Sequence, residues 1–291
     1  MSQQRLFVSD SFAVLQDAFV TAVQALKTAD PLAPLTVLAP SDLLALRLRR
    51  AVAWAGSGHV GLYIFTLLDF AREIAEGTLS QEGQQPLPPL AAPLIVRKLL
   101  SETETSNYFA PLATQPGFPR SFLATIADLK HAGVQPQDLR TFIERAQLRG
   151  TYRHKVDSLH VLYDRYARFL AEQRLYDDVD LIERAVAVLE ASPGTTPVFL
   201  YGFYEFTPLQ RRLVAAALRE RDVLVFFPWR SGPAYEHAVP ALSWLTGLGL
   251  QYTPLAGRQR RKKTTSPGCR HDCLKGCLLG LLGQALDLTI R

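Results

Sequence analysis

The first 256 residues contain no cysteine, and the three cysteines of the chain, Cys269, Cys273 and Cys277, all fall in its last 35 residues. An H-x-x-x-H pair and a G-x-S-x-G elbow are also missing, so nothing indicates hydrolytic or redox chemistry. No apolar run reaches the roughly 18–20 residues of a membrane span, Leu278–Leu288 being too short. Met1–Ser11 shows no basic start followed by an apolar run, so we expect no signal peptide and a cytoplasmic protein without a membrane partner.

The net charge of +5 is placed unevenly along the chain. Residues 257–291 carry eight Lys or Arg against two Asp, a net of +6. Residues 1–256 therefore carry 24 basic and 25 acidic residues, a net of −1. The main body is neutral, so its charge does not indicate a nucleic-acid footprint.

Strand and helix patterns alternate at both ends of the body and predict an α/β fold with a parallel sheet. Between them the strand signal vanishes and helical patterns follow one another. We therefore expect an α/β domain in residues 1–87, a helical insert in 88–196, a return to the α/β domain in 197–256 and a divergent tail in 257–291. A helix stop is expected at Gly77.

Four local patterns suggest ligand sites, and each has a simpler interpretation. Gly56–Gly61 matches G-x-G-x-x-G, but a helix precedes it and a strand follows, the reverse of a dinucleotide loop. Asp177, Asp178 and Asp180 stand at a helix start, where carboxylates cap free N–H groups. The cysteines at i, i+4, i+8 lack the paired spacing of structural zinc. Arg258–Lys263 fits a solvated tail better than a phosphate site. We expect no metal and no cofactor.

Several segments resemble the first motor domain of UvrD/PcrA-type helicases and, more closely, the N-terminal region of AddB-type (RexB-like) subunits of helicase–nuclease complexes. Val37–Arg49 is similar to the strand, loop and helix that touch single-stranded DNA. Ile64–Ala71 is similar to the T-F-H-S-F-A segment, with Leu68 in place of the histidine. Tyr176–Ile182 and Tyr201–Gln210 resemble the D-F-x-D-L and D-E-x-Q segments, and Gly202–Gln210 fits the G-F-x-E-F-T-P-x-Q form seen in AddB-like chains.

The resemblance implies a RecA-like sheet, yet both halves of the nucleotide site are missing. ATP hydrolysis needs a glycine-rich loop with lysine and a carboxylate pair on the opposing strand. After the first strand stand Ser9, Asp10 and Ser11 with no glycine or lysine, and Tyr201 and Gly202 occupy the carboxylate positions. We therefore expect a degenerate nucleotide site, no catalytic residue and no ATP turnover.

The resemblance also implies a DNA side, formed by loops at the carboxyl ends of strands. Ser41, Arg47, Thr66 and Tyr204 are the candidate DNA contacts, for single-stranded or duplex-end DNA. Glu205, Thr207 and Gln210 are the family residues that the fold retains. Three functions stay open: a non-catalytic scaffold beside an AddA-like subunit in double-strand-break repair, an active subunit completed by a partner chain, and an interaction domain with no DNA role.

AddB-like proteins continue with a second motor-like domain and a PD-(D/E)XK-type nuclease, and the 291 residues contain neither. A truncated or frameshifted reading frame is our expectation for residues 257–291.

Overall fold

The computed structural model of the protein describes residues 4–56, 60–103 and 107–255. At its centre lies a six-stranded sheet with the strand order β3-β2-β6-β7-β1-β8, in which all neighbours are parallel. The strands are β1 Gln4–Ser9, β2 Leu35–Leu38, β3 Leu62–Phe65, β6 Val198–Tyr201, β7 Val223–Pro228 and β8 Gln251–Pro254. The predicted α/β fold with a RecA-like parallel sheet is confirmed.

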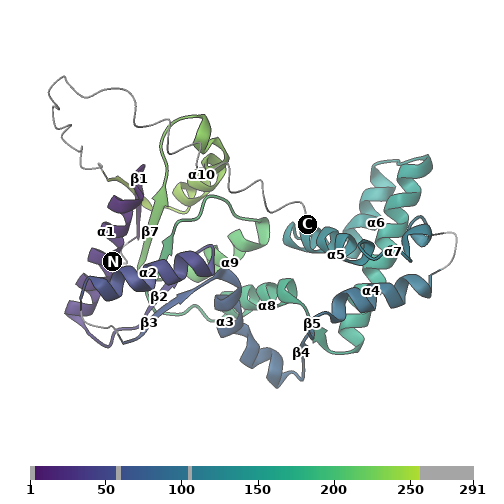
Figure 1. Ribbon diagram of the computed structural model, residues 1–291, viewed down its shortest axis with the longest axis horizontal. Helices are drawn as coiled ribbons and strands as arrows, with labels where there is room; N and C mark the ends of the chain where they lie inside the picture. The colour runs from purple at the N-terminus through teal and green to yellow at the C-terminus, as the bar shows by residue number, and fades with distance from the viewer. Residues whose placement is uncertain (1–3, 57–59, 104–106, 256–291) are drawn as a thin grey trace, which may run out of the picture. The chain divides into compact units, whose positions relative to one another are not determined.

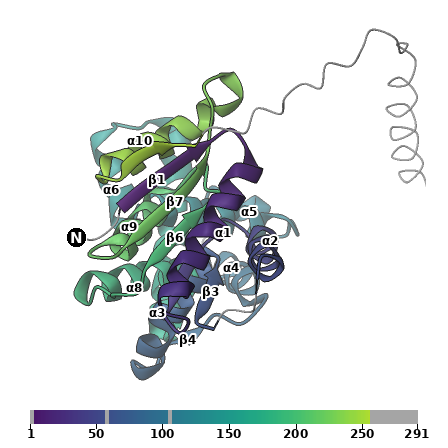
Figure 2. The same ribbon diagram turned by 90° about the vertical axis from the view of Figure 1, so that its left-hand side faces the viewer.

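Helices cover both faces of this sheet, as buried parallel strands require. One face carries α1 (Phe12–Ala29) and α2 (Asp42–Trp54), and α1 lies across the strands in Figure 2. The other face carries four helices, namely α3 Leu67–Gln81, α8 Asp178–Ala191, α9 Pro208–Leu218 and α10 Val239–Gly247, the last preceded by the 3₁₀ turn η2 Pro233–Ala238. In the described part of the chain, no helix combines the length and apolarity needed to span a membrane.

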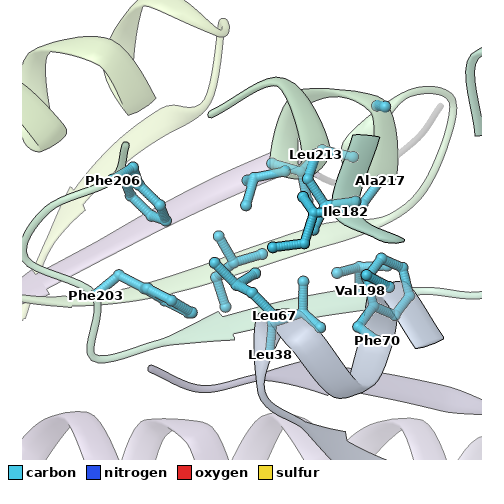
Figure 3. Close-up of a cluster of buried hydrophobic side chains, with 14 of the residues drawn as sticks. Leu38, Leu67, Phe70, Ile182, Val198, Phe203, Phe206, Leu213 and Ala217 are labelled. Atoms are coloured by element: carbon cyan, nitrogen blue, oxygen red, sulfur yellow. The ribbon is translucent and has the colours of Figure 1, made fainter. Parts of the chain in front are cut away.

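The sheet has one hydrophobic core on each face, because side chains along a strand alternate between the two faces. Val37, Phe199 and Phe226 point toward α1 and α2. Leu38, which follows Val37, points the other way into the larger cluster. Figure 3 shows how that cluster is filled, with side chains of α3, α8 and α9 meeting over the sheet; the labelled members are Leu38, Leu67, Phe70, Ile182, Val198, Phe203, Phe206, Leu213 and Ala217.

The sheet is interrupted by a segment of helices with its own core. Its elements are α4 Ala91–Ser101, the 3₁₀ turn η1 Ala110–Leu112, α5 Phe118–His131, α6 Pro136–Arg145 and α7 Gly150–Glu172. These helices gather away from the sheet in Figure 1. The chain enters and leaves them through a parallel pair of two-residue strands, β4 Gln85–Pro86 and β5 Leu175–Tyr176.

The predicted helix stop at Gly77 is wrong, because α3 continues to Gln81. Glycine inside a helix costs about 1 kcal/mol relative to alanine. Leu79, two residues further on, is buried against the larger core and its burial offsets that cost. The packing of Leu79 therefore overrides the low helix propensity of the exposed Gly77.

Candidate functional site

The turn after β1 occupies the place of a phosphate-binding loop and consists of only Asp10 and Ser11. The buried Ser9 hydroxyl donates to the Leu255 carbonyl at 3.0 Å and accepts the Ser11 N–H at 3.3 Å. Ser11 Oγ in turn accepts the Val14 N–H at 3.4 Å and caps α1. N–H groups at a helix start are the ones that face a phosphate in such loops. Here the Ser11 side chain accepts one of them, the Val14 N–H.

Tyr201, at the first carboxylate position, belongs to the core of the protein. Its ring packs edge-on against Phe19 at 5.5 Å between centroids and is stacked with Phe226 at 5.9 Å. The hydroxyl donates to the Phe12 carbonyl at 3.5 Å. Burial raises the pKa of Tyr201 to about 12, although the nearby Arg47 opposes this shift. The side chain is thus neutral at physiological pH and offers no anionic ligand to a metal.

Gly202, at the second carboxylate position, has a backbone that disfavours a side chain. Its φ is +79°, a left-handed conformation that favours glycine. A Cβ placed there would lie 2.7 Å from Leu44 Cδ2, which reaches over from α2. The Gly202 N–H donates to the Phe226 carbonyl at 3.0 Å, which fixes this conformation. Leu44 was not singled out from the sequence, because nothing local links it to Gly202.

The family residues after Gly202 start helix α9. Thr207 is its N-cap, and Thr207 Oγ1 accepts the Gln210 N–H at 3.2 Å. Gln210 Oε1 accepts the Thr207 N–H at 3.0 Å and completes a capping box. Glu205 is exposed in the preceding loop.

Ser41 and Thr66 stand at the carboxyl ends of the neighbouring strands β2 and β3, each as the N-cap of the helix that follows. The exposed Ser41 accepts the Leu44 N–H at 3.4 Å. Thr66 accepts the Asp69 N–H at 3.2 Å and donates to Asp69 Oδ2 at 2.7 Å. Two helix starts are thereby placed side by side on one edge of the sheet.

Tyr204 follows β6, the strand next to β2, so Thr66, Ser41 and Tyr204 succeed three neighbouring strands. Its half-buried ring lies 5.7 Å from the His237 ring and 6.4 Å from the Tyr235 ring. Burial raises the pKa of Tyr204, and the charge of the nearby Tyr235 adds to the effect. His237 and Tyr235 lie in η2, outside any pattern that the sequence offered.

Arg47 is exposed on α2, and its Nε donates to Gln16 Oε1 on α1 at 3.1 Å. The Arg47 side chain therefore links helix α2 to helix α1.

The other sequence patterns resolve as follows. A helix precedes Gly56 and a strand follows Gly61, while residues 57–59 lie outside the described range. Asp177 caps α8 by accepting the N–H groups of Val179 and Asp180. Within the described ranges no group of three His, Cys, Asp or Glu side chains is placed to hold a metal ion. The three cysteines and Arg258–Lys263 also lie outside the described residues.

A RecA-like α/β domain with a helical insert is the class of protein that the fold defines, and serine caps, Tyr201 and Leu44 lie at the carboxyl ends of its strands β1 and β6 and beside them. The family model described as ADDB, N-terminal matches residues 57–233, more than half of the chain. The chain belongs to this family, and the resemblance drawn from its motifs is confirmed.

Similar curated proteins are named as a subunit of an ATP-dependent helicase/deoxyribonuclease. The Bacillus subtilis (strain 168) protein is 24% identical over 195 residues, covering 59% of this chain and 17% of the relative. The Acetivibrio thermocellus protein is 23% identical over 193 residues, covering 64% and 16%. The Desulforamulus reducens protein is 27% identical over 138 residues, covering 46% and 12%. The chain thus matches only about an eighth to a sixth of the length of these relatives.

Proposed function

We propose that this chain is a non-catalytic, helicase-like scaffold and DNA-contact module of an AddB-type helicase–nuclease complex that acts in DNA double-strand-break repair. Its partners in this proposal are an AddA-like subunit and single-stranded or duplex-end DNA. The α/β domain, which includes α8, and the insert formed by α4 to α7 are the two parts of this module.

The observation that carries the non-catalytic part of this proposal is the geometry around Gly202. A carboxylate there needs a Cβ at 2.7 Å from Leu44 Cδ2 on a backbone with φ of +79°. At the other half of the site, the turn after β1 has only two residues, neither of them glycine or lysine, and Ser11 Oγ accepts the Val14 N–H. A nucleotide would find neither a phosphate cradle nor a magnesium ligand at these positions.

The DNA part is supported by the opposite character of the neighbouring strand ends. Ser41 and Thr66 mark two helix starts whose dipoles favour phosphate. The Tyr204 ring, with the rings of Tyr235 and His237 beside it, offers aromatic surface for an unstacked base. Backbone phosphates and stacked bases are the two features by which proteins hold single strands without reading sequence.

An ATPase assay on the purified chain tests the first part. We expect no magnesium-dependent phosphate release above the level without protein, with or without single-stranded DNA. Turnover that disappears in a Ser11→Ala/Thr66→Ala double variant would favour an active subunit instead, because contaminating enzymes would not respond to the change.

Binding of a fluorescent single-stranded oligonucleotide tests the second part. We expect a dissociation constant that rises steeply with salt, and a weaker affinity in Arg47→Gln. Arg140→Gln on α6 is the matched control, because it removes the same charge from an exposed position in the insert. Equal effects of the two changes, or binding that ignores salt, would favour an interaction domain with no DNA role.

A further inference from the structure

We propose that Lys130 is a latch that holds the helical insert on the α/β domain across a hinge made by β4 and β5. This inference is independent of the proposed function, since it concerns how two parts of the described chain are joined. It rests on a buried lysine that takes part neither in the sheet nor in the proposed DNA contacts.

The hinge is defined by the two places where the chain crosses between the parts. β4 and β5 run parallel, and their joining bonds are Gln85 N–H to the Arg174 carbonyl at 2.8 Å and Leu87 N–H to the Tyr176 carbonyl at 2.9 Å. Gly83 and Arg174 both have positive φ, at +74° and +53°, so the chain bends at both crossings. Two short connections at one place form the usual geometry of a domain hinge.

Lys130 reaches across this hinge from the end of α5 to the start of α8. Its Nζ lies 2.7 Å from Asp177 Oδ1 and 2.6 Å from both Asp177 Oδ2 and Asp180 Oδ1. The lysine side chain is only 7% exposed, whereas the ion pairs elsewhere in the insert, such as Arg140–Glu144, are largely exposed. A buried, doubly paired ammonium resists separation far more than a surface pair does.

The two carboxylates play unequal parts. Burial favours the neutral form of Asp177, but the charge of Lys130 and the hydrogen bonds outweigh it and hold the pKa of Asp177 below its ordinary value. Burial and the charge of Asp177 raise the pKa of Asp180 in spite of Lys130. Asp177 is therefore the permanent anchor and Asp180 the weaker one. The other titratable groups that interact with this cluster are Glu183 on α8 and Tyr163 and Tyr166 on α7; Arg212 on α9 acts on Glu183, and Asp138 on α6 acts on Tyr163.

Other polar support across the hinge is weak. Gln135 Nε2 donates to Glu183 Oε1 at 3.4 Å, a long bond between exposed groups. A cavity of about 670 Å³ is lined on both sides of the boundary by Tyr163, Tyr166, Leu79 and Arg184 among others, while Ala127 on α5 packs against the larger core. Loss of the lysine charge would therefore free the insert to turn about β4 and β5.

Hydrogen exchange in the full chain provides the test. In Lys130→Met we expect the Gln85 and Leu87 amides to exchange at least about tenfold faster, because the strand pair opens when the insert moves. The Gly202 amide, bonded inside the α/β domain, should keep its rate. Lys98→Met on α4 is the control, since its 4.0 Å pair with Glu102 stays within the insert.

Spin labels give an independent readout of the same motion. Labels at Arg50→Cys on α2 and Gln137→Cys on α6, with the three native cysteines changed to serine, should give a broader distance distribution in Lys130→Met. Should that variant fail to fold, Asp180→Asn removes only the weaker anchor and should raise the exchange of the same two amides several-fold. Unchanged rates and distances, or a rise that includes Gly202, would overturn the latch.

Discussion

The carboxyl edge of the sheet has two halves of opposite character. At the ends of β1 and β6, Ser9 and Ser11 bond within a two-residue turn, the Tyr201 ring is buried and Leu44 approaches Gly202. We call this the closed half. At the ends of β2 and β3, the exposed Ser41 and the half-buried Thr66 begin helices α2 and α3, and we call this the open half.

The comparison shows that the ends of parallel strands in one sheet can differ in how far the protein's own side chains cover them. Strand ends in a parallel sheet are places where helix dipoles and free N–H groups gather, whatever the ligand. In the closed half, side chains and backbone satisfy those groups internally, so the edge contributes to stability. The open half is the part that the proposed function assigns to a partner.

The largest expected effect comes from adding a side chain in the closed half. Gly202→Ala should lower the free energy of unfolding by about 2–4 kcal/mol, through the strained φ and the contact with Leu44. Gly133→Ala is the matched control: φ there is +78° but nothing lies within 4 Å of the new Cβ, so about 1 kcal/mol is expected. Urea denaturation of both variants gives the difference.

Gly202→Asp tests ATPase activity as well as stability. The variant should lose at least as much stability as Gly202→Ala and gain no ATPase activity, because the serine-capped turn after β1 still lacks a phosphate site. Equal losses for Gly202→Ala and Gly133→Ala would contradict the role of Leu44, and ATP turnover in Gly202→Asp would contradict the closed half.

The sequence predicts what is local and misses what is brought together from afar. The helix caps at Ser11, Ser41 and Thr66 can be read from three or four consecutive residues, and the alternation of apolar residues predicts the main strands. Leu44 and Gly202 are far apart in the chain, and so are Lys130 and Asp177. No periodicity links such pairs, so the reason for the missing carboxylate and the presence of the latch both required the structure.

Short or exposed elements are also hard to predict from the sequence. β8 reads Gln-Tyr-Thr-Pro and has no apolar run, yet it pairs with β1 because Leu255 N–H bonds to the Val8 carbonyl at 2.8 Å and the sheet edge is otherwise free. Gly77 looked like a helix end because the packing of Leu79 cannot be seen from the glycine.

Alkaline pH provides the next largest effect. The pKa of Tyr201 is raised to about 12, above the roughly 10 of an unfolded chain, so its contribution to stability is complete below pH 10 and is lost as pH rises through 12. Between about pH 9 and about pH 12, the free energy of unfolding of Tyr201→Phe should fall by about 2 kcal/mol less than that of the wild type. Chemical denaturation across that range measures it. Tyr204 is only half-buried, so the difference in unfolding free energy between Tyr204→Phe and the wild type should be smaller over this range. An equal difference would contradict the contrast between the two tyrosines.

Helix caps in the closed half come next. Ser11→Ala and Thr207→Ala should each cost about 1 kcal/mol of unfolding free energy, since each leaves a helix N–H without its partner. The caps begin different helices, so their effects should add in the double variant. Ser80→Ala, exposed within α3, is the control and should change stability by less than about 0.5 kcal/mol. Losses no larger than that control would mean that solvent satisfies these N–H groups equally well.

The smallest expected effect separates the two halves most directly. Thr66→Ala removes a cap as Ser11→Ala does, and both should cost about 1 kcal/mol of stability. Only Thr66→Ala should weaken the binding of single-stranded DNA, by about three- to tenfold, because only its helix start faces a partner. Fluorescence anisotropy at one fixed salt concentration compares them. If both variants weaken binding alike, affinity follows stability and the open half has no special role; if Ser11→Ala alone weakens it, the DNA lies at the half that we describe as closed.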